Sequence, residues 1–459
     1  MIRYARASIP LLMALLTQAA SVSIARAQDD VLRLMAEPVG YTDVLDAFDG
    51  DDPFDVNVTL GFERNANSGT IQREVVDFDA EDGRGTRHFV DVAEHDHVQN
   101  VLELGLAVGL FRDLMVFAHL PVVLAEEREL TPAGTSRCPA GSAEPACTAL
   151  QTPFPDGTAG PLFRLDPALV SGKRSGVPRV GLGIAWGVTN QYRNPAFATW
   201  VLRAEWEVDT GDVRNPCVSN GEGCEPGVSP GVDALRFESR WSYRFRYVEP
   251  VFGLGHTFQW ISTGDALYRP AGALEGMQED GPPGVTHLQL GAAIIPWEDR
   301  GRHQRLSVEM MGSAERIGAG RDISPLFDAL GASDNAHLTA SHVSDFANPA
   351  ASQPLAFTGI TRVEAFTRMR MRASLVVQAA RYVRFTLGLG LGHELGHLIT
   401  GEPACNTSVS VSPGDPRAGD CIRGIANPAH RPAIDAPGQR FRADGHTLFD
   451  LFASAAGQF

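Results

Sequence analysis

The sequence lacks long hydrophobic runs after its first 27 residues: no later stretch approaches 18 consecutive apolar residues. Because a transmembrane helix needs about 20 such residues, helical membrane spans are excluded. Strands of a transmembrane barrel need only about ten residues of alternating character, so this absence leaves a barrel open. Positive charge is also scarce, and the formal net charge is −16. A surface of that sign repels phosphates, which argues against a nucleic-acid partner.

The first 27 residues follow the order of a secretory signal peptide. Arg3 and Arg6 come before an apolar run from Ile9 to Ala20, and the small residues around Ala27 supply a cleavage site. A single anchoring helix is the alternative, but a run of about 12 apolar residues is too short to span a bilayer. The sequence therefore predicts a signal peptide over residues 1–27, followed by a short acidic periplasmic segment over residues 28–52.

Apolar residues alternate with small or polar residues through most of the remaining chain, which is the pattern of strands with two different faces. Between residues 98 and 110 the even positions are apolar except for Asn100, and the odd positions are mostly small or polar. Residues 178–188 repeat this scheme, and a helix there would have to carry three glycines at about 1 kcal/mol each. Twelve candidate strands follow, near residues 54–63, 97–110, 114–124, 178–188, 196–208, 233–244, 248–260, 286–297, 302–314, 360–380, 382–396 and 447–459.

The connections between these strands alternate strictly between short and long. Outer-membrane barrels have short periplasmic turns and long extracellular loops, and an even strand count returns both ends to the periplasm. The sequence therefore predicts an all-β fold, a transmembrane antiparallel up-and-down β-barrel of about 12 strands over residues 53–459. Residues 68–78 and 86–93 contain enough Val, Ile and Phe to extend the first two strands or to add a hairpin. The expected short turns are 111–113, 189–195, 245–247, 298–301 and 381, and the expected long loops are 64–96, 125–177, 209–232, 261–285, 315–359 and 397–446.

The last residues support the same topology. The chain ends in Phe459, preceded at even steps by Phe449, Leu451 and three small residues. This ending resembles the C-terminal strand of bacterial outer-membrane barrels, whose terminal aromatic residue is recognised by the insertion machinery. It departs from the usual form in being rich in Ala. From about residue 53 the chain is broadly similar to outer-membrane barrels of the channel and transporter type, without the signature of one family. The resemblance implies an outer-membrane location, with membrane lipid and the insertion machinery, through Phe459, as partners.

The six cysteines form three pairs, each confined to one expected long loop. Fifteen pairings are formally open, but two cysteines within one loop are the most apt to meet, and loops of this length gain from a cross-link. A secreted chain passes through the oxidising periplasm, where such bonds persist. Six free thiols are the alternative. We predict the disulfides Cys138–Cys147, Cys217–Cys224 and Cys405–Cys421.

The faces opposite the apolar ones carry charge, and these are the faces that would line the lumen. An Arg on the lipid side at mid-membrane costs about 2–4 kcal/mol, so the placement of charges on one face supports the strand register. An Arg-rich wall would select small anionic solutes. Alternatively, Arg and Glu neutralise one another and brace a narrow lumen that conducts little. The expected lumen residues are Arg203, Glu205, Glu207, Arg236, Glu238, Arg240, Arg244, Arg305, Glu309, Arg362, Glu364, Arg368, Arg370, Arg372 and Arg384.

Within that set, the series Arg368, Arg370 and Arg372 has the fewest acidic neighbours in the sequence. We therefore expect a solute anion to bind there. In the loop 315–359, Ser324-Pro325 precedes an apolar run and predicts a short capped helix that could fold over the pore mouth.

One motif favours an enzyme: His393-Glu394-Leu395-Gly396-His397 matches His-Glu-x-x-His and resembles the zincin metalloproteases by those five residues only. That chemistry needs a helix, whereas the preceding residues alternate like a strand. In a strand the two histidines would lie about 13 Å apart, too far to share a zinc ion. The sequence contains no serine in a recognisable nucleophile setting.

The sequence thus favours a non-enzymatic barrel channel or transporter for small anionic solutes, with no cofactor and no metal. A structural or adhesive surface barrel is the first alternative, and a zinc metalloprotease is the less favoured one.

Overall fold

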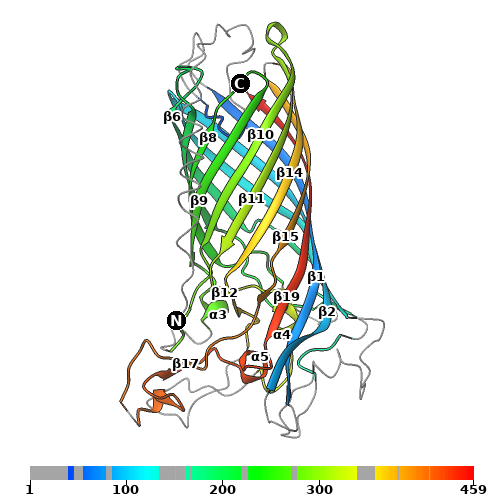
Figure 1. Ribbon diagram of the computed structural model, residues 1–459, viewed down its shortest axis with the longest axis vertical. Coiled ribbons are helices and arrows are strands. Elements are labelled where there is room, and N and C mark those ends of the chain that lie inside the picture. The colour runs from blue at the N-terminus through cyan, green and yellow to red at the C-terminus, as the bar shows by residue number, and fades with distance from the viewer. Residues whose placement is uncertain are drawn as a thin grey trace.

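The computed structural model describes residues 40–45, 55–78, 85–133, 150, 161–165, 168–218, 226–269, 276–338, 357–380, 382–412 and 414–458. The expected signal peptide and Phe459 lie outside these ranges. Twelve antiparallel strands pair in chain order and the last pairs with the first, which closes a barrel (Figure 1). The strands are β1 (Val56–Phe78), β2 (Gly85–Phe111), β3 (Leu114–Pro132), β6 (Arg179–Thr189), β7 (Thr199–Asp209), β8 (Val232–Ser242), β9 (Val248–Ile261), β10 (Val285–Asp299), β11 (Gln304–Ile317), β14 (Phe366–Ala380), β15 (Val383–Glu394) and β19 (Phe441–Gln458).

All twelve predicted strands are confirmed, but several predicted boundaries are wrong. β3 continues to Pro132 instead of ending at residue 124, and β19 begins at Phe441 instead of at residue 447. The expected loop 64–96 is mostly strand, because β1 and β2 stay paired as far as Phe78 and Gly85. The residues rich in Val, Ile and Phe continue the alternation there and extend the hairpin beyond the other strands. The expected strand 360–380 begins six residues later, at Phe366, because Thr361–Val363 forms a separate strand, β13, outside the barrel.

The outer wall of the barrel is apolar, as the alternation predicts. Leu104, Leu106 and Leu110 of β2 are exposed, and so are Leu387, Leu389 and Leu391 of β15. Charged residues occupy the alternate positions, which face the lumen. Such a wall avoids placing charge in lipid, and it identifies the barrel as a membrane-spanning one. Within the described ranges, no helix is long and apolar enough to cross a membrane.

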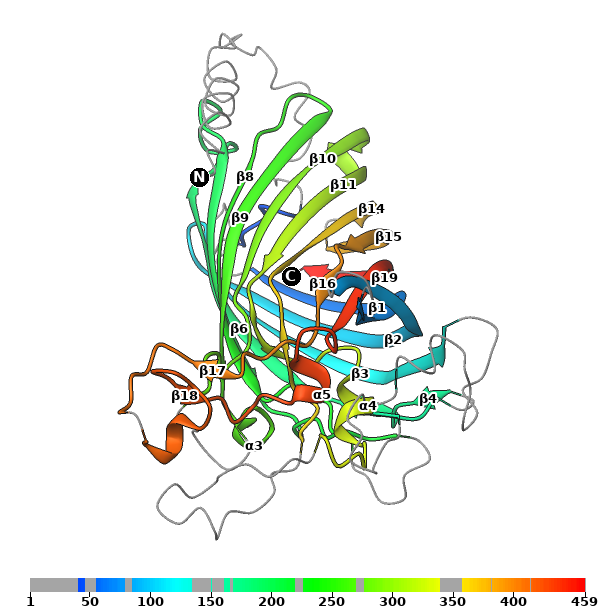
Figure 2. The ribbon, with the colours of Figure 1, turned by 60° about the horizontal axis from the view of Figure 1, so that its bottom comes forward.

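The two ends of the barrel differ. One end, here called the turn end, carries connections of a few residues and the η1 turn (Arg300–Arg302). The other, the loop end, carries the long connections and is assigned to the cell exterior because outer-membrane barrels place their long loops there. Figures 1 and 2 show the short elements gathered at the loop end. They are β4 (Leu169–Val170), β5 (Arg174–Gly176), α3 (Asp265–Tyr268), β12 (Gly320–Asp322), α4 (Phe327–Gly331), β13, β16 (His397–Leu398), β17 (Cys405–Asn406), η3 (Pro416–Ala418), β18 (Ile425–Ala426) and α5 (Pro432–Asp435).

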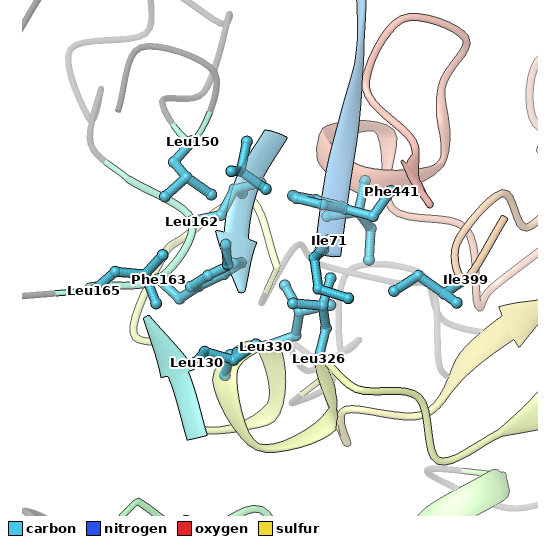
Figure 3. Packing of buried hydrophobic residues seen from close by; sticks show 14 of the residues in the cluster. Ile71, Leu130, Leu150, Leu162, Phe163, Leu165, Leu326, Leu330, Ile399 and Phe441 are labelled. Carbon is cyan, nitrogen blue, oxygen red and sulfur yellow. The ribbon is translucent and has the colours of Figure 1, made fainter. Parts of the chain in front are cut away.

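These loop-end connections pack on a hydrophobic core of their own, and together they are called the cap. Ile71 of β1 and Phe441 of β19 lie beside Phe163, and Leu326 and Leu330 fill the space below them (Figure 3). All five side chains are buried. The predicted short helix after Ser324-Pro325 is confirmed as α4, and its apolar residues join this core. The predicted cap is wrong, because the N-cap residue is Leu326 and no side chain caps the helix. Burial of a side chain of this size contributes about 1.5–3 kcal/mol, so the core orders loops that would otherwise lack a fold of their own.

Buried ion pairs connect the loops of the cap. Arg174 of β5 donates to Asp328 of α4 over 2.6 Å, and both side chains are almost fully buried. Arg321 of β12 lies 3.3 Å from Glu402, which is buried in the following loop. Each pair joins two different connections, so together they tie three of the long connections to one another.

Residues 40–45 lie inside the barrel at the turn end, and they are here called the plug. The sequence placed them in a periplasmic segment, and the rest of the expected segment 28–52 lies outside the described residues. Leu45 is buried among Met115, Phe117, Ala185 and Val201, on the inner faces of β3, β6 and β7. The plug therefore occupies the lumen near the turn end.

Candidate functional site

The lumen is the candidate site, because the closed barrel turns most of the predicted charges toward it. On the wall formed by β7 and β8, every charge lies in a network. Arg203 donates to Glu205 over 3.1 Å, and Arg240 donates to Glu238 over 2.5 Å. Arg236 donates to Glu207 over 3.1 Å. The first two pairs lie within one strand at a spacing of two residues, and only the Arg236–Glu207 pair crosses from β8 to β7. Alternate residues of neighbouring strands share one face, so the register of β7 and β8 places all six side chains on the same wall.

Two histidines that are not among the predicted lumen residues complete this wall. His119 Nδ1 of β3 lies 2.6 Å from Glu205, and His287 Nε2 of β10 lies 2.9 Å from Glu238. Both occupy inward positions of their strands. The alternation alone would have placed both histidines on the inner face. However, neither has a charged residue two positions away, and such pairs of charges are the feature that identifies most of the other lumen residues.

The opposite wall contains the series Arg368, Arg370 and Arg372. Arg368 donates to Glu394 over 2.6 Å and to Glu315 over 3.4 Å. Arg372 donates to Glu63 over 2.5 Å and lies 3.1 Å from Asp450, while Arg370 lies 3.8 Å from the same carboxylate. The expectation that these arginines have few acidic neighbours is therefore wrong. Their partners belong to β1, β11, β15 and β19, which closure of the barrel brings alongside β14.

The remaining predicted lumen residues are distributed unevenly. Arg305 and Glu309 face inward from β11, and Arg384 lies 3.4 Å from Asp43 of the plug. Arg244 is buried at the turn end, 2.8 Å from Glu298. Arg362 and Glu364 are not lumen residues, because they precede the first residue of β14. Arg362 belongs to β13 of the cap and donates to Glu279 over 2.9 Å.

Pairing does not make the lumen surface neutral, because the two partners are buried to different extents. The side chains of Arg236 and Arg372 are 38% and 36% exposed, whereas those of their partners Glu207 and Asp450 are 8% and 3% exposed. The same order holds for Arg203, Arg240, Arg368 and Arg370 against Glu205, Glu238, Glu394 and Asp450. Glu63 and Glu315 are the partly exposed exceptions. In these ion pairs the arginine side chain is therefore more accessible than its carboxylate partner.

A cation site in the lumen is conceivable on geometry alone. Ligand atoms of His119, Glu205 and Glu207 all lie within 4.8 Å of one another. However, Arg179 and Arg236 both contact Glu207, and Arg203 contacts Glu205. Three guanidinium groups already compensate two carboxylates, so a divalent ion there would meet repulsion.

The His-Glu-x-x-His segment is extended, as the alternation predicts. Glu394 is the last residue of β15, and His397 opens β16. His393 is exposed on the outer face, Glu394 is buried toward the lumen, and His397 stacks on Phe366 with ring centroids 3.7 Å apart. His397 is buried, whereas His393 is exposed. The two histidines do not converge on a shared metal position, so the zincin arrangement is absent from this segment.

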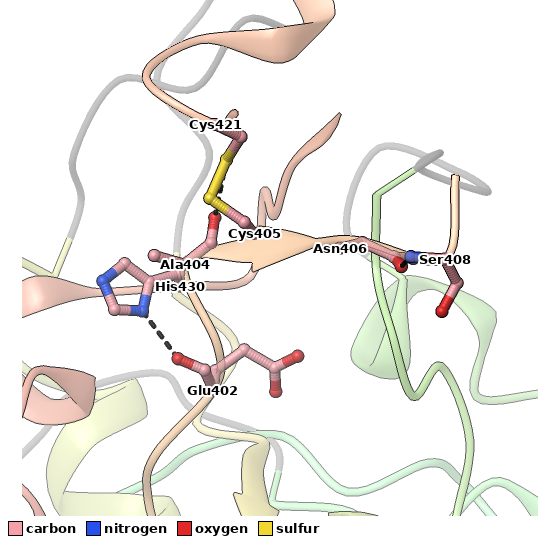
Figure 4. Close-up of a disulfide and its surroundings, with 7 residues drawn as sticks. All are labelled: Glu402, Ala404, Cys405, Asn406, Ser408, Cys421 and His430. Carbon is pink, nitrogen blue, oxygen red and sulfur yellow. Dashed lines mark hydrogen bonds between the residues drawn. A yellow bond between two sulfur atoms is a disulfide. The ribbon is translucent and has the colours of Figure 1, made fainter. Parts of the chain in front are cut away.

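One predicted disulfide is confirmed: Cys405 and Cys421 are bonded and join β17 to the segment before β18 (Figure 4). Cys217 is also disulfide-bonded, and its expected partner Cys224 lies outside the described residues. Cys138 and Cys147 lie outside them as well, so that pairing stays a prediction. Both described bridges belong to the cap, which is consistent with its position on the oxidising side of the membrane.

The plug is held mainly by polar contacts. The Tyr41 hydroxyl donates to Gln289 over 2.6 Å, Thr42 and Ser242 share a hydrogen bond of 2.7 Å, and Arg240 donates to the Tyr41 carbonyl over 3.2 Å. Gly253 makes room for the tyrosine, because a Cβ there would lie 1.7 Å from its hydroxyl oxygen. The barrel wall is thus complementary in shape to the plug at Gly253.

No family model and no curated protein matches the chain. Among solved structures, it is similar to an outer membrane channel from Pseudomonas putida F1, with 10% identity over 92% of this chain and 99% of that one and a TM-score of 0.37. A FadL homologue from Pseudomonas aeruginosa matches with 8% identity over 93% of both chains and a TM-score of 0.32. The outer membrane protease OmpT from Escherichia coli matches with 8% identity over 88% of this chain and 96% of that one and a TM-score of 0.27.

Likenesses this distant say nothing about solute or activity. The barrel itself supplies the assignment: it is closed, antiparallel and twelve-stranded, apolar outside and charged inside. This is the fold of a bacterial outer-membrane β-barrel.

Proposed function

We propose that the barrel is a channel that conducts small anionic solutes across the outer membrane. The observation that carries the proposal is the asymmetric burial of the lumen ion pairs, in which the carboxylates are buried against the wall and the guanidinium groups remain accessible. An anion passing Arg236 or Arg372 would meet positive charge at close range, and the carboxylate of each pair lies farther from its path.

The pairing also fits transport better than tight binding. A channel must attract its solute and release it again. Because Glu207 and Asp450 partly neutralise the arginines next to them, each position attracts an anion only weakly. Several weak positions on two walls form a path, whereas one uncompensated cluster would trap the solute.

The plug and the cap imply that conduction is gated. The plug enters the turn end, and the cap covers the loop end. Side chains of the lumen beneath the cap, such as Glu126 and His446, are almost fully buried. We therefore expect low basal conductance that rises when one of these elements is displaced.

Reversal potentials in a potassium chloride gradient test the selectivity. The purified chain in planar bilayers should prefer chloride, and Arg236→Ala together with Arg372→Ala should shift the preference several-fold toward potassium. Arg302→Ala is the matched control, because its side chain is 77% exposed at the turn end and lies outside the lumen wall. Cation preference in the unaltered chain, or an equal shift in the control, would contradict the proposal.

The covering of both ends favours a second candidate, a structural surface barrel that conducts nothing. The same bilayers separate the two candidates when the plug is removed by deleting residues 40–45. A channel should then conduct, whereas a structural barrel should remain silent although it still shows the mobility shift of a folded barrel on gels.

A further inference from the structure

Three imidazole rings meet in the lumen directly beneath the cap. His95 and His97 project from β2, and His446 projects from β19. The rings of His95 and His446 are stacked with centroids 5.5 Å apart and an interplanar angle of 20°, and His97 lies 6.4 Å from His95. His95 and His446 are only 3% and 2% exposed. They are here called the histidine cluster.

The backbone is shaped to bring these rings together. The pairing of β1 with β19 shifts between Ser68 and Thr70, and Gly445 takes a φ of 64°, which turns His446 inward. Gly69 of β1 lies between the two histidine-bearing strands. A Cβ there would approach the ring of His446 to 2.1 Å, so only glycine leaves room for the stack. The juxtaposition therefore depends on one glycine and one irregularity in register.

The rings lack the contacts that buried imidazoles normally make. Among the described residues, neither nitrogen of His95 and neither nitrogen of His446 has a hydrogen-bond partner. A buried polar group without a partner costs free energy, and water would satisfy it if the cap moved away. Burial also penalises a positive charge on either ring, so the closed state requires them to be neutral.

A contact between cap and barrel lies next to the cluster. Arg214, in the connection between β7 and β8, donates both terminal nitrogens to Glu126 of β3 over 2.6 Å each. His97 Nε2 and an Arg128 nitrogen each lie 3.3 Å from the same carboxylate, which is fully buried. This contact is here called the latch. It is the point at which the cap connection holds the inner face of the barrel.

We propose that the histidine cluster is a proton-sensitive switch that releases the latch when the exterior becomes acidic. This inference rests on the proposed channel function. A protonated His97 would compete with Arg214 for Glu126. Protonated His95 and His446 would add two buried positive charges to a site that already holds Arg128 and Arg214.

The other charged groups around the cluster do not cancel that effect. His446 faces Glu394 of β15, Arg368 of β14, His397 of β16 and Asp444 of its own strand. Glu394 is already bonded to Arg368, which leaves it little capacity to stabilise a further cation. Repulsion then acts on the Arg214 side chain, which is the cap group that contacts Glu126. The rest of its segment stays attached to the cap, because Arg174 donates to the Asn215 carbonyl and the Cys217 amide donates to Asp328.

Hydrogen exchange of the full chain in micelles tests the switch without relying on conduction. Protection of residues 210–218, corrected for intrinsic rates, should fall about tenfold between about pH 7.5 and about pH 5, a window that brackets the ordinary imidazole pKa of about 6.5. In His95→Asn with His446→Asn this loss should disappear. His393→Asn is the matched control, because His393 is exposed on the outer face near the same end of β15.

Arg214→Met provides the second variant, since it removes the latch without touching the histidines. It should leave residues 210–218 poorly protected at both pH values. Unchanged protection of the unaltered chain between the two pH values would overturn the switch. A pH-dependent latch in a chain that never conducts, even without residues 40–45, would uphold the switch and overturn the channel. Conductance in a chain whose latch shows no pH dependence would uphold the channel and overturn the switch.

Discussion

The two ends of the barrel are covered by unlike elements. The cap has a hydrophobic core drawn from four barrel strands and three loops, and buried ion pairs tie its loops together. The plug has one fully buried apolar side chain, Leu45, while Tyr41 and Val44 are only partly buried against the wall. Hydrogen bonds of Tyr41 and Thr42 and an ion pair of Asp43 complete its attachment. Both obstruct the lumen, but only the cap resembles a folded domain.

This difference indicates which end opens more readily. Each buried side chain of the cap core contributes about 1.5–3 kcal/mol, whereas a neutral hydrogen bond of the plug contributes about 1 kcal/mol net. Segments with few buried apolar contacts are the ones that open locally in native proteins. The plug is therefore the more easily displaced cover. Within the cap, the Arg174–Asp328 pair is supported by apolar packing of α4, whereas the latch consists of charged groups around Glu126.

The largest expected effect is on the cap. Arg174→Met would leave Asp328 buried without its cation, and breaking a buried ion pair in this way costs about 3–5 kcal/mol. Hydrogen exchange of α4 should report the loss. The neighbouring Lys173→Met is the matched control, because Lys173 is 82% exposed and pairs with Glu127 over 3.6 Å at the surface. That exposed pair is worth less than about 1 kcal/mol. Equal effects of the two variants would show that the loops of the cap do not depend on their buried pair.

The disulfide of the cap should have the second largest effect. Cys405→Ser with Cys421→Ser opens a closed loop of about 15 residues, which corresponds to about 3 kcal/mol. The loss should be confined to β17 and β18, because neither strand contributes to the apolar core in Figure 3. Hydrogen exchange with and without a reductant measures it. Loss of protection at α4 in the same variant would mean that the cap unfolds as one unit rather than in parts.

The plug should respond to a far smaller change. Gly253→Ala places a methyl group where the Tyr41 hydroxyl lies, so the tyrosine must leave Gln289. Loss of that hydrogen bond, and of the Arg240 guanidinium 4.9 Å above the ring, removes about 1–2 kcal/mol of attachment. Conductance at neutral pH should then rise about tenfold, since about 1.4 kcal/mol corresponds to that factor.

Gly312→Ala is the control for that variant. Its added methyl group would meet only an ordinary contact 3.6 Å away, on another strand of the same barrel. No change with Gly253→Ala, or an equal rise with Gly312→Ala, would show that residues 40–45 do not limit conduction.

The sequence predicts the barrel much better than it predicts either cover. Strands and lumen faces follow from a period of two, which is local, and the Cys405–Cys421 bridge follows from two cysteines in one loop. The covers depend on contacts between distant residues. Ile71 meets Phe441 only after the barrel closes, and Arg372 meets Glu63 across 309 positions of sequence. The alternation placed Arg372 on the correct face, but it gave no information about which strand would contribute the carboxylate that pairs with it.

The smallest expected effect is a pH dependence within the cap. Burial raises the pKa of Glu402, while Arg321 and Asn427 oppose the shift. The folded cap therefore keeps this proton to a higher pH than the unfolded chain, whose carboxyl titrates near about 4.3. Between the pKa of Glu402 in the unfolded chain and its raised pKa in the folded cap, the folded state binds more protons. The stability of the cap therefore falls as the pH rises through this range. The segment around Glu402 should thus lose protection from about pH 4 upward, which is the opposite direction to the latch.

Glu402→Gln tests this directly, because the amide oxygen can still accept from Asn427 but the side chain no longer titrates. Exchange at Gly401 and Glu402, whose amides donate to Asp435, is the appropriate measure. The pH dependence should weaken rather than vanish, since burial also raises the pKa of Asp435. The exposed Asp415→Asn should leave the profile at these two amides unchanged. If acid loosened residues 401–402 as it loosens the latch, the cap would titrate as a single unit, and the contrast between its packed core and its charged latch would be lost.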